Sequence, residues 1–281
     1  MEGEDAHHVP KLNRGTNMRK DEARKRQIKQ KMGLVEPNNM KTRVIAPVSV
    51  KRERKLKRTI DVDGGPLDGV LPGVIVVLGT SMSGKTTWII NALLQKAIFG
   101  GLFDVLHIIS STIQVDDSYQ HLIDLPEAKL HISFTGDTEK DIKGAMTKAK
   151  QEGRTLHQGV VVDDGVSSDI SGRGNPMQSF ASVARHYTDM TLISTQDLRA
   201  TALPKFRNQV RMYVIMKRSS DTDRKNLFRE LGAYYGGDKE LERIFREATD
   251  GDNPYAFLLL NVPQQTAWKG FNELLYKGAE T

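Results

Sequence analysis

The chain has 281 residues, of which 38% are apolar, so it can bury one α/β core of ordinary size plus some unburied sequence at an end. It contains no apolar run of the roughly 18 residues needed to span a bilayer, and its N-terminus is charged, so we expect a soluble, unsecreted protein with no membrane span. The absence of cysteine excludes disulfides and zinc–thiolate sites, and the seven histidines are scattered without metal-ligand spacing. Magnesium held by oxygen ligands is the one metal implied.

The net positive charge of the chain comes from residues 1–60, because the rest of the chain is mildly acidic. Residues 1–60 carry 17 Lys/Arg and 7 Asp/Glu, whereas the other 221 residues carry 24 and 28. This segment has few aromatic residues and buries too little apolar surface to offset the entropy of ordering, so we predict a mostly disordered basic arm with a helix near residues 20–31. Two functions stay open for it: a solvated tail that keeps the chain soluble, or an arm that binds DNA phosphates. The folded domain is predicted over residues 61–281.

From residue 73 onward, short apolar runs alternate with segments of helical periodicity. Strands are expected at residues 74–78, 105–109, 130–134, 160–163, 191–195, 212–216 and 257–261. Helices are expected at residues 85–98, 138–151, 176–187, 224–231 and 239–248. Strands alternating with crossover segments of this length predict an α/β fold with a doubly wound, mostly parallel sheet.

The segment from Gly79 to Thr86 fits the pattern of a glycine, four residues, then glycine, lysine and threonine, and it lies between an expected strand and an expected helix. The glycines let successive backbone N–H groups point at phosphate oxygens, and the helix adds its positive end. In this pattern Lys85 reaches the β and γ phosphates, and the Thr86 hydroxyl ligates magnesium. The flanking elements disfavour the alternative of a glycine-rich turn without a ligand. We therefore predict that ATP and Mg²⁺ are bound by Gly79, Thr80, Ser81, Met82, Ser83, Gly84, Lys85, Thr86 and Thr87.

A second motif is the apolar strand expected to end in Asp163 and Asp164. In P-loop ATPases the first acid of such a pair holds magnesium, and the next acid polarises the attacking water. We assign Asp163 to the metal and Asp164 to catalysis. Taken alone, these residues also fit a strand followed by an Asp-Gly turn, because Gly165 comes next; the phosphate-binding loop favours the catalytic interpretation.

A third motif is the apolar strand expected at residues 191–195, which is followed by Gln196. Ligands of open parallel sheets bind at the carboxyl ends of the strands. We therefore predict that Gln196 faces the γ phosphate, orients the lytic water and reports whether the phosphate is present. The alternative is an ordinary loop residue after a strand.

These three motifs, in this order, resemble the DNA-packaging ATPases of large eukaryotic DNA viruses and their poxvirus relatives, within the FtsK/HerA superfamily of P-loop NTPases. The resemblance covers about residues 73–216 and implies a RecA/FtsK-like core. Met82 departs from the glycine-rich filler usual in the loop, with no consequence for catalysis because backbone N–H groups make the phosphate contacts. The more specific matches are Val162-Asp163-Asp164, Arg185-His186-Tyr187, Ser194-Thr195-Gln196-Asp197, Phe206-Arg207-Asn208 and the Ser-Gly-Lys-Thr of residues 83–86.

The family implies a ring of identical subunits with ATP sites at the interfaces, where each site needs a cation from the neighbour. Arg185 is the first candidate for this arginine finger and Arg207 the second; the alternative for each is a surface arginine paired with a carboxylate. Because Arg185 precedes the strand that delivers Gln196, we expect it near one edge of the nucleotide-bearing face. The resemblance also implies double-stranded DNA and a viral capsid component as partners. It places the protein in the host cell cytoplasm, in the viral factory or on the virion.

Other functions fit the sequence less well. A GTPase would need an Asn-Lys-x-Asp segment, which is absent, and thymidine kinases usually carry a cysteine-bound zinc that this chain cannot build. A chromosome-pumping translocase or a helicase shares the same core chemistry and stays open, although no further helicase motif is evident. A non-hydrolysing, nucleotide-gated adaptor would be expected to lose one of the two acids, and both are present. We therefore predict an ATPase that translocates double-stranded DNA into a capsid.

Overall fold

The computed structural model describes residue 56 and residues 64–163, 175–199 and 203–278. Apart from Leu56, the predicted basic arm lies outside these residues, as do the predicted domain boundary near residue 60 and Asp164. The predictions made for them stay predictions.

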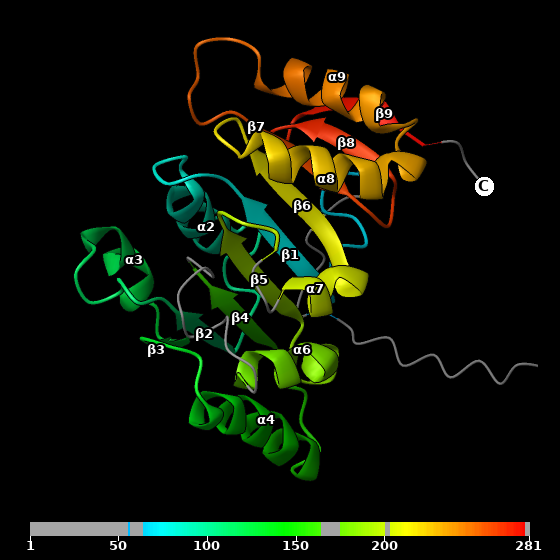
Figure 1. Ribbon diagram of the computed structural model, residues 1–281. Coiled ribbons are helices and arrows are strands. Elements are labelled where there is room, and N and C mark those ends of the chain that lie inside the picture. The colour runs from blue at the N-terminus through cyan, green and yellow to red at the C-terminus, as the bar shows by residue number, and fades with distance from the viewer. Residues whose placement is uncertain (1–55, 57–63, 164–174, 200–202, 279–281) are drawn as a thin grey trace, which may run out of the picture. The chain divides into compact units, whose positions relative to one another are not determined.

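Nine strands form one sheet in the order β3-β2-β4-β5-β1-β6-β7-β8-β9 (Figure 1). The pairs among β1 to β6 are all parallel, whereas β7, β8 and β9 continue the sheet from β6 in antiparallel fashion. The predicted α/β fold with a mostly parallel sheet is therefore confirmed. The strands are β1 Gly73–Leu78, β2 Val105–Ile109, β3 Ala128–His131, β4 Gln158–Val162, β5 Met190–Thr195, β6 Val210–Met216, β7 Phe257–Asn261, β8 Thr266–Lys269 and β9 Glu273–Lys277.

Helices cover both faces of the sheet, as the doubly wound prediction requires. Along β1 the side chains alternate: Val74 and Val76 join the core under α4, α6, α8 and α9, whereas Ile75 and Val77 join the core under α2. Helices α8 and α9 lie side by side next to the antiparallel strands (Figure 1). The α-helices are α2 Lys85–Leu94, α3 Gln120–Ile123, α4 Gly136–Gln151, α6 Pro176–Tyr187, α7 Leu203–Phe206, α8 Asp221–Leu231 and α9 Asp238–Thr249; the 3₁₀ turns are η2 Asp117–Tyr119, η3 Arg207–Gln209 and η4 Gly232–Tyr234.

Side-chain caps set where the long helices begin. The Thr135 hydroxyl accepts from the backbone N–H of Thr138 at the start of α4, and Ser220 does the same for α8. Asn175 caps α6, which then begins with Pro176, a residue suited to the first helical turn. Within the described residues, every helix is too short or too polar to cross a membrane.

The sheet differs from the sequence prediction at its two edges. β3 was expected at residues 130–134 but runs from Ala128 to His131, because this edge strand is fixed by its pairing with β2 and not by burial. Accordingly, Leu130 and Ile132 are 41% and 58% exposed. At the other edge, β8 and β9 were not predicted at all.

The strand order places β5 between β1 and β4. Leu78 at the end of β1 pairs with Thr195 at the end of β5, and Val162 at the end of β4 pairs with Ile193. The segments that follow β1, β4 and β5 therefore leave the sheet at the same edge, which is where all three sequence motifs lie.

Candidate functional site

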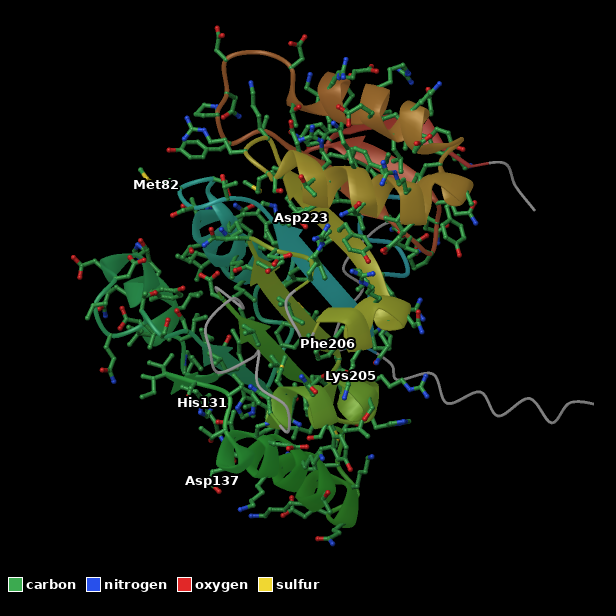
Figure 2. All side chains as sticks on the ribbon, in the orientation of Figure 1. Met82, His131, Asp137, Lys205, Phe206 and Asp223 are labelled. Atoms are coloured by element: carbon green, nitrogen blue, oxygen red, sulfur yellow. The ribbon has the colours of Figure 1, made fainter. Side chains whose placement is uncertain are left out.

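The phosphate-binding loop joins β1 to α2, and close packing requires a glycine at both of its ends. A Cβ atom on Gly79 would fall on the side chains of Ser83 and Met216. Gly84 has a left-handed φ of 94°, and a Cβ atom there would lie 2.8 Å from the ring of Tyr255. Met82 has a positive φ of 59°, and its side chain is 84% exposed and points to solvent (Figure 2).

Hydrogen bonds hold this loop between the ends of β5 and β6. Gly79 N donates to Thr195 O at 3.1 Å, and Thr80 donates to Arg218 O through its backbone N at 2.7 Å and its hydroxyl at 3.0 Å. Lys85 closes the loop from the inside, because its buried Nζ donates to Thr80 O at 3.0 Å. These hydrogen bonds fix the position of the loop relative to β5 and to the segment that follows β6.

The first two motifs meet through Thr86 and Asp163. Thr86 Oγ1 donates to Asp163 Oδ2 at 2.8 Å, although the two residues are 77 positions apart in sequence. Asp163 directly follows β4 and is only 4% exposed. Its carboxylate also accepts hydrogen bonds from the hydroxyls of Ser194, on β5, and Tyr119, on η2. Hydroxyls from three separate segments therefore orient one buried carboxylate.

The fold explains how this carboxylate is held. Because β5 lies between β1 and β4, Ser194 on β5 is close enough to Asp163 to donate a hydrogen bond to its carboxylate. Burial raises the pKa of the Tyr119 phenol, and the neighbouring Asp163 raises it further, so the hydroxyl keeps its proton and remains a donor. Thr86 and Asp163 offer the hard oxygen ligands that Mg²⁺ prefers, so the residues present fit this metal.

The sequence analysis gave no role to Ser194, which it quoted only as part of a matching segment, and it did not identify Tyr119. A serine near the end of an apolar strand was the signal that could have identified Ser194. Tyr119 lies in a short turn far from every motif, and nothing in its local sequence marks it.

The catalytic candidates beyond Asp163 differ in what the structure shows. Gln196 directly follows β5, is half-buried, and lies at the same edge as the loop because Thr195 O accepts from Gly79 N. Asp164 lies outside the described residues. The catalytic roles assigned to Asp164 and Gln196 stay predictions.

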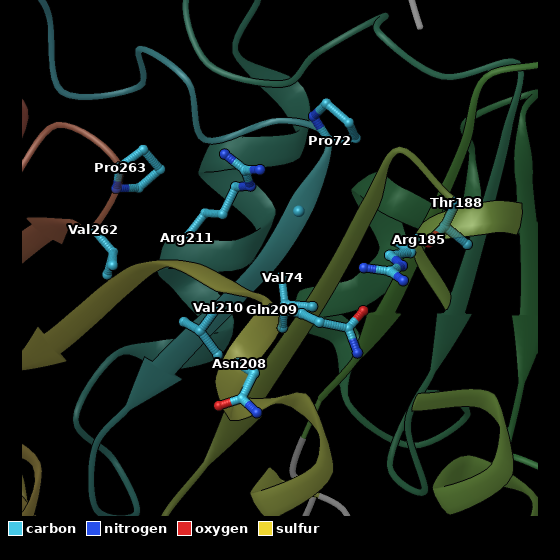
Figure 3. A pocket seen from close by; sticks show the side chains of 11 residues that line it. Pro72, Val74, Arg185, Thr188, Asn208, Gln209, Val210, Arg211, Val262 and Pro263 are labelled. Atoms are coloured by element: carbon cyan, nitrogen blue, oxygen red, sulfur yellow. The ribbon is translucent and has the colours of Figure 1, made fainter. Parts of the chain in front are cut away.

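The two candidate arginine fingers lie away from the phosphate-binding loop of their own chain. Arg185, in the last turn of α6, lines a cavity of about 290 Å³ together with Arg211 at the amino ends of β1 and β6 (Figure 3). Its expected position near the nucleotide-bearing face is wrong, because α6 runs back from the carboxyl end of β4 to the amino end of β5. Arg207 donates to Glu230 Oε1 at 2.7 Å and to Leu198 O at 3.3 Å. Whether either arginine completes a neighbour's site stays a prediction.

No protein-family model and no curated protein matches the sequence. Among solved structures, the genome packaging NTPase B204 from Sulfolobus turreted icosahedral virus 2, in complex with AMP, is similar with a TM-score of 0.46 and 15% identity, over 74% of this chain and 99% of that chain. The DNA-packaging ATPase B204 from Sulfolobus Turreted Icosahedral Virus gives 0.46 and 17%, over 75% and 100%. EssC (ATPases 2 and 3) from Geobacillus thermodenitrificans gives 0.46 and 15%, over 74% and 39%. A likeness this distant is one of general shape, so the functional conclusion rests on the site.

The fold also gathers a group of metal-ligating side chains that sequence spacing did not reveal. His107, His131 and Asp141, which show no metal-ligand spacing in the sequence, place atoms that could ligate a metal within 4.8 Å of one another (Figure 2 labels His131). Pairing of β2 with β3 brings His107 Nδ1 to 3.1 Å from His131 Nε2. Burial, with a smaller contribution from His131, lowers the pKa of His107 to about 4, so His107 is neutral at pH 7. Lys129 Nζ donates to both carboxylate oxygens of Asp141, at 3.1 and 2.9 Å, and so balances its charge.

Proposed function

We propose that this chain is an ATPase of the P-loop class that uses hydrolysis to translocate double-stranded DNA into a viral capsid. The observation that carries the ATPase part is the 2.8 Å hydrogen bond between Thr86 and Asp163. It joins the hydroxyl of the loop to the carboxylate of the second motif across an intervening strand. A glycine-rich turn and an unrelated Asp-Gly turn would have no reason to meet in this way.

Five side chains and the backbone of the loop contribute to binding. Backbone N–H groups of the loop and the amino end of α2 receive the phosphates. Lys85 moves from its loop carbonyl onto the β and γ phosphates, where it stabilises the charge that develops during transfer. Thr86 and Asp163 would hold Mg²⁺, which shields the phosphate charges when bound. The hydroxyl of Tyr119, like that of Ser194, keeps the Asp163 carboxylate in place.

Water activation is assigned to Asp164 and Gln196. Gln196 holds a water in line with the γ phosphate, and Asp164 accepts a proton from it. The water oxygen forms a bond to the γ phosphorus, and the bond from that phosphorus to the bridging oxygen of the β phosphate breaks. ADP and phosphate are the products.

The DNA and capsid parts of the proposal are supported by the motif resemblance to packaging ATPases of large eukaryotic DNA viruses. They are also supported by the charge of residues 1–60, where 17 Lys/Arg against 7 Asp/Glu suit contacts with DNA phosphates. A ring of identical subunits, with one arginine of each subunit completing the neighbour's site, belongs to the same proposal. So does a location in the host cytoplasm, in the viral factory or on the virion.

Two variants test the ATPase part by failing in different ways. Lys85→Ala should weaken ATP affinity and turnover together, because Lys85 acts on both the ground state and the transition state. Asp164→Asn should keep nearly normal ATP affinity and lose about 10²- to 10⁴-fold in turnover, because Asp164 acts on water. Lys96→Ala, which alters an exposed lysine just beyond α2, is the control and should change neither. Normal turnover in Asp164→Asn would remove its catalytic assignment, and a wild-type chain that does not hydrolyse ATP would overturn the proposal.

The motor part is tested by measuring ATPase turnover of the full chain with and without duplex DNA. Stimulation by DNA, together with ATP-dependent displacement of a third strand from a triplex, is the result expected of a translocase. An ATPase turnover that is the same with and without duplex DNA would exclude a DNA motor. ATP binding without turnover would instead favour a nucleotide-gated adaptor.

A further inference from the structure

A surface cavity lies next to the end of the phosphate-binding loop. This cavity has a volume of about 430 Å³, and its lining includes Gly84 and Thr87, further residues of α2, and Phe257 at the start of β7. A nucleotide whose phosphates occupy the loop must place its ribose and base somewhere beyond the first turn of α2. The cavity is therefore in the right place to be considered as the site of the base.

Three aromatic rings that pack against one another line part of the cavity. Trp88, on α2, is 7% exposed and stacks on Phe271 with ring centroids 6.0 Å apart and an interplanar angle of 16°. Phe257, at the start of β7, meets Trp88 edge-on at 6.2 Å and Phe271 edge-on at 5.5 Å. Rings that pack against one another in this way form a wall that needs little rearrangement to accept another ring, and its one polar atom, the buried Trp88 Nε1, has no hydrogen-bond partner among the described residues.

Tyr255 also lines the cavity, and its aromatic ring is unusually exposed. Its side chain is 58% exposed, and its ring lies so close to the loop that a Cβ atom on Gly84 would be 2.8 Å from Cδ1. The segment that carries Tyr255 is fixed to the end of β6, because Lys217 N donates to Ala256 O at 2.8 Å and Lys217 Nζ donates to Gly251 O at 2.5 Å. A large ring that is mostly exposed beside the loop contributes little to the core, but it presents a face for stacking.

The side chains that line the cavity limit the class of ligand that it can bind. None of the residues that line the cavity is acidic or basic; the polar ones are hydroxyls and amides such as those of Thr87, Asn91 and Gln95. The cavity therefore suits a flat, uncharged aromatic group. Guanine presents an N1–H and a 2-amino donor side by side, which a carboxylate would accept together, and the lining has no carboxylate; adenine presents only its 6-amino donor, which one amide oxygen, that of Asn91 or Gln95, can accept.

We propose that this cavity is the base-binding subsite of the nucleotide site, that Tyr255 is its stacking platform, and that it selects adenine over guanine. The proposal rests on the function proposed above, because the phosphates must lie in the loop for the base to reach the cavity. Tyr255 is a binding and specificity residue here and has no part in the chemical step.

The test compares three ligands with the full chain by titration calorimetry: ATP, GTP and inorganic tripolyphosphate, which has phosphates but no base. Tyr255→Ala should weaken ATP binding by about 5- to 150-fold, the range for loss of one base-stacking ring, and should leave tripolyphosphate binding unchanged. Tyr255→Phe should keep ATP affinity within about twofold, because it keeps the ring. Tyr234→Ala is the matched control, since Tyr234 is 47% exposed on η4 and does not line the cavity.

A second variant tests the cavity without touching Tyr255. Asn91→Trp adds a large ring from an exposed position of α2 and should fill the cavity, so that ATP binds more weakly while tripolyphosphate binds as before. Wild-type ATP affinity in both Tyr255→Ala and Asn91→Trp would overturn the base subsite. If Lys85→Ala still loses both ligands, the ATPase proposal stands on its own. Equal affinity of the wild-type chain for GTP and ATP would overturn the selection of adenine. A wild-type chain that binds neither ATP nor tripolyphosphate would overturn the proposed function itself.

Discussion

Replacing Tyr119 by Phe removes one hydroxyl from the Asp163 carboxylate and keeps the ring. Tyr119 is 1% exposed, and its hydroxyl donates to Oδ2, the same oxygen that accepts from Thr86. A hydrogen bond to a charged group contributes about 1.5–3 kcal/mol, and at so buried a position water does not readily replace the lost donor. For a domain of this size, 1 kcal/mol corresponds to roughly 2–4 °C, so the Tm should fall by about 3–12 °C.

The same change should weaken magnesium binding. Groups that orient a metal-ligating carboxylate typically contribute about 10- to 100-fold to metal affinity, so the Mg²⁺ concentration for half-maximal ATP hydrolysis should rise by that factor. ATP affinity measured without metal should stay near wild type. Tyr235→Phe is the matched control, because Tyr235 is equally buried and its hydroxyl donates to a backbone carbonyl, Asn261 O, at 2.9 Å; it should leave the Mg²⁺ dependence unchanged. A folded Tyr119→Phe variant with wild-type Mg²⁺ dependence would refute the idea that Tyr119 orients Asp163.

Three further predictions concern other parts of the chain. Arg185→Ala should lose about 10³- to 10⁵-fold in ATPase turnover and still bind ATP. Mixing this variant with Asp164→Asn should restore part of the ATPase activity, at interfaces where both residues are intact. If rings that demonstrably contain both variants recover no activity, Arg185 is not an arginine finger. Deleting residues 1–58 should flatten the slope of log DNA affinity against log salt, which is about −5 if about six Lys/Arg engage phosphates, whereas an unchanged slope would favour a solubility tail. Because burial lowers the pKa of His107 from 6.5 to about 4 in the folded chain, the unfolded chain binds more protons between these values, and the free energy of unfolding should fall by about 3 kcal/mol as the pH drops through that window. Urea unfolding of His107→Leu at pH 7 and pH 4 should lack this part of the acid destabilisation, and an identical fall in the variant would argue against it.

The parallel core could be predicted because strands buried on both faces appear in the sequence as continuous apolar runs. The bounds of β2, β7 and α6 agree with the prediction residue for residue. The two sheet edges could not be predicted in the same way. β8 and β9 are short and partly exposed, so pairing with a neighbour decides their conformation more than their own pattern does, and β3 follows the register of β2.

In the site, as in the sheet, the features encoded in consecutive residues could be predicted and those that depend on the strand order could not. The phosphate-binding loop is encoded in consecutive residues, so its geometry follows directly from its sequence. The contacts of Asp163 depend on which strand lies beside which, and local pattern does not specify that order. The roles of Ser194 and Tyr119 as partners of Asp163 were therefore identified only from the structure. The position of Arg185 was predicted wrongly for a related reason, since it depends on the direction in which a crossover helix returns.

The contacts of Asp163 also bear on when the site forms as the chain folds. The carboxylate accepts a hydrogen bond from Thr86, 77 positions earlier in the sequence, and another from Ser194, 31 positions later. Contacts between residues so far apart in the sequence form only after long segments of chain have been brought together, which costs loop-closure entropy and slows folding. A growing chain therefore cannot complete the contacts of this carboxylate before β5 has been synthesised.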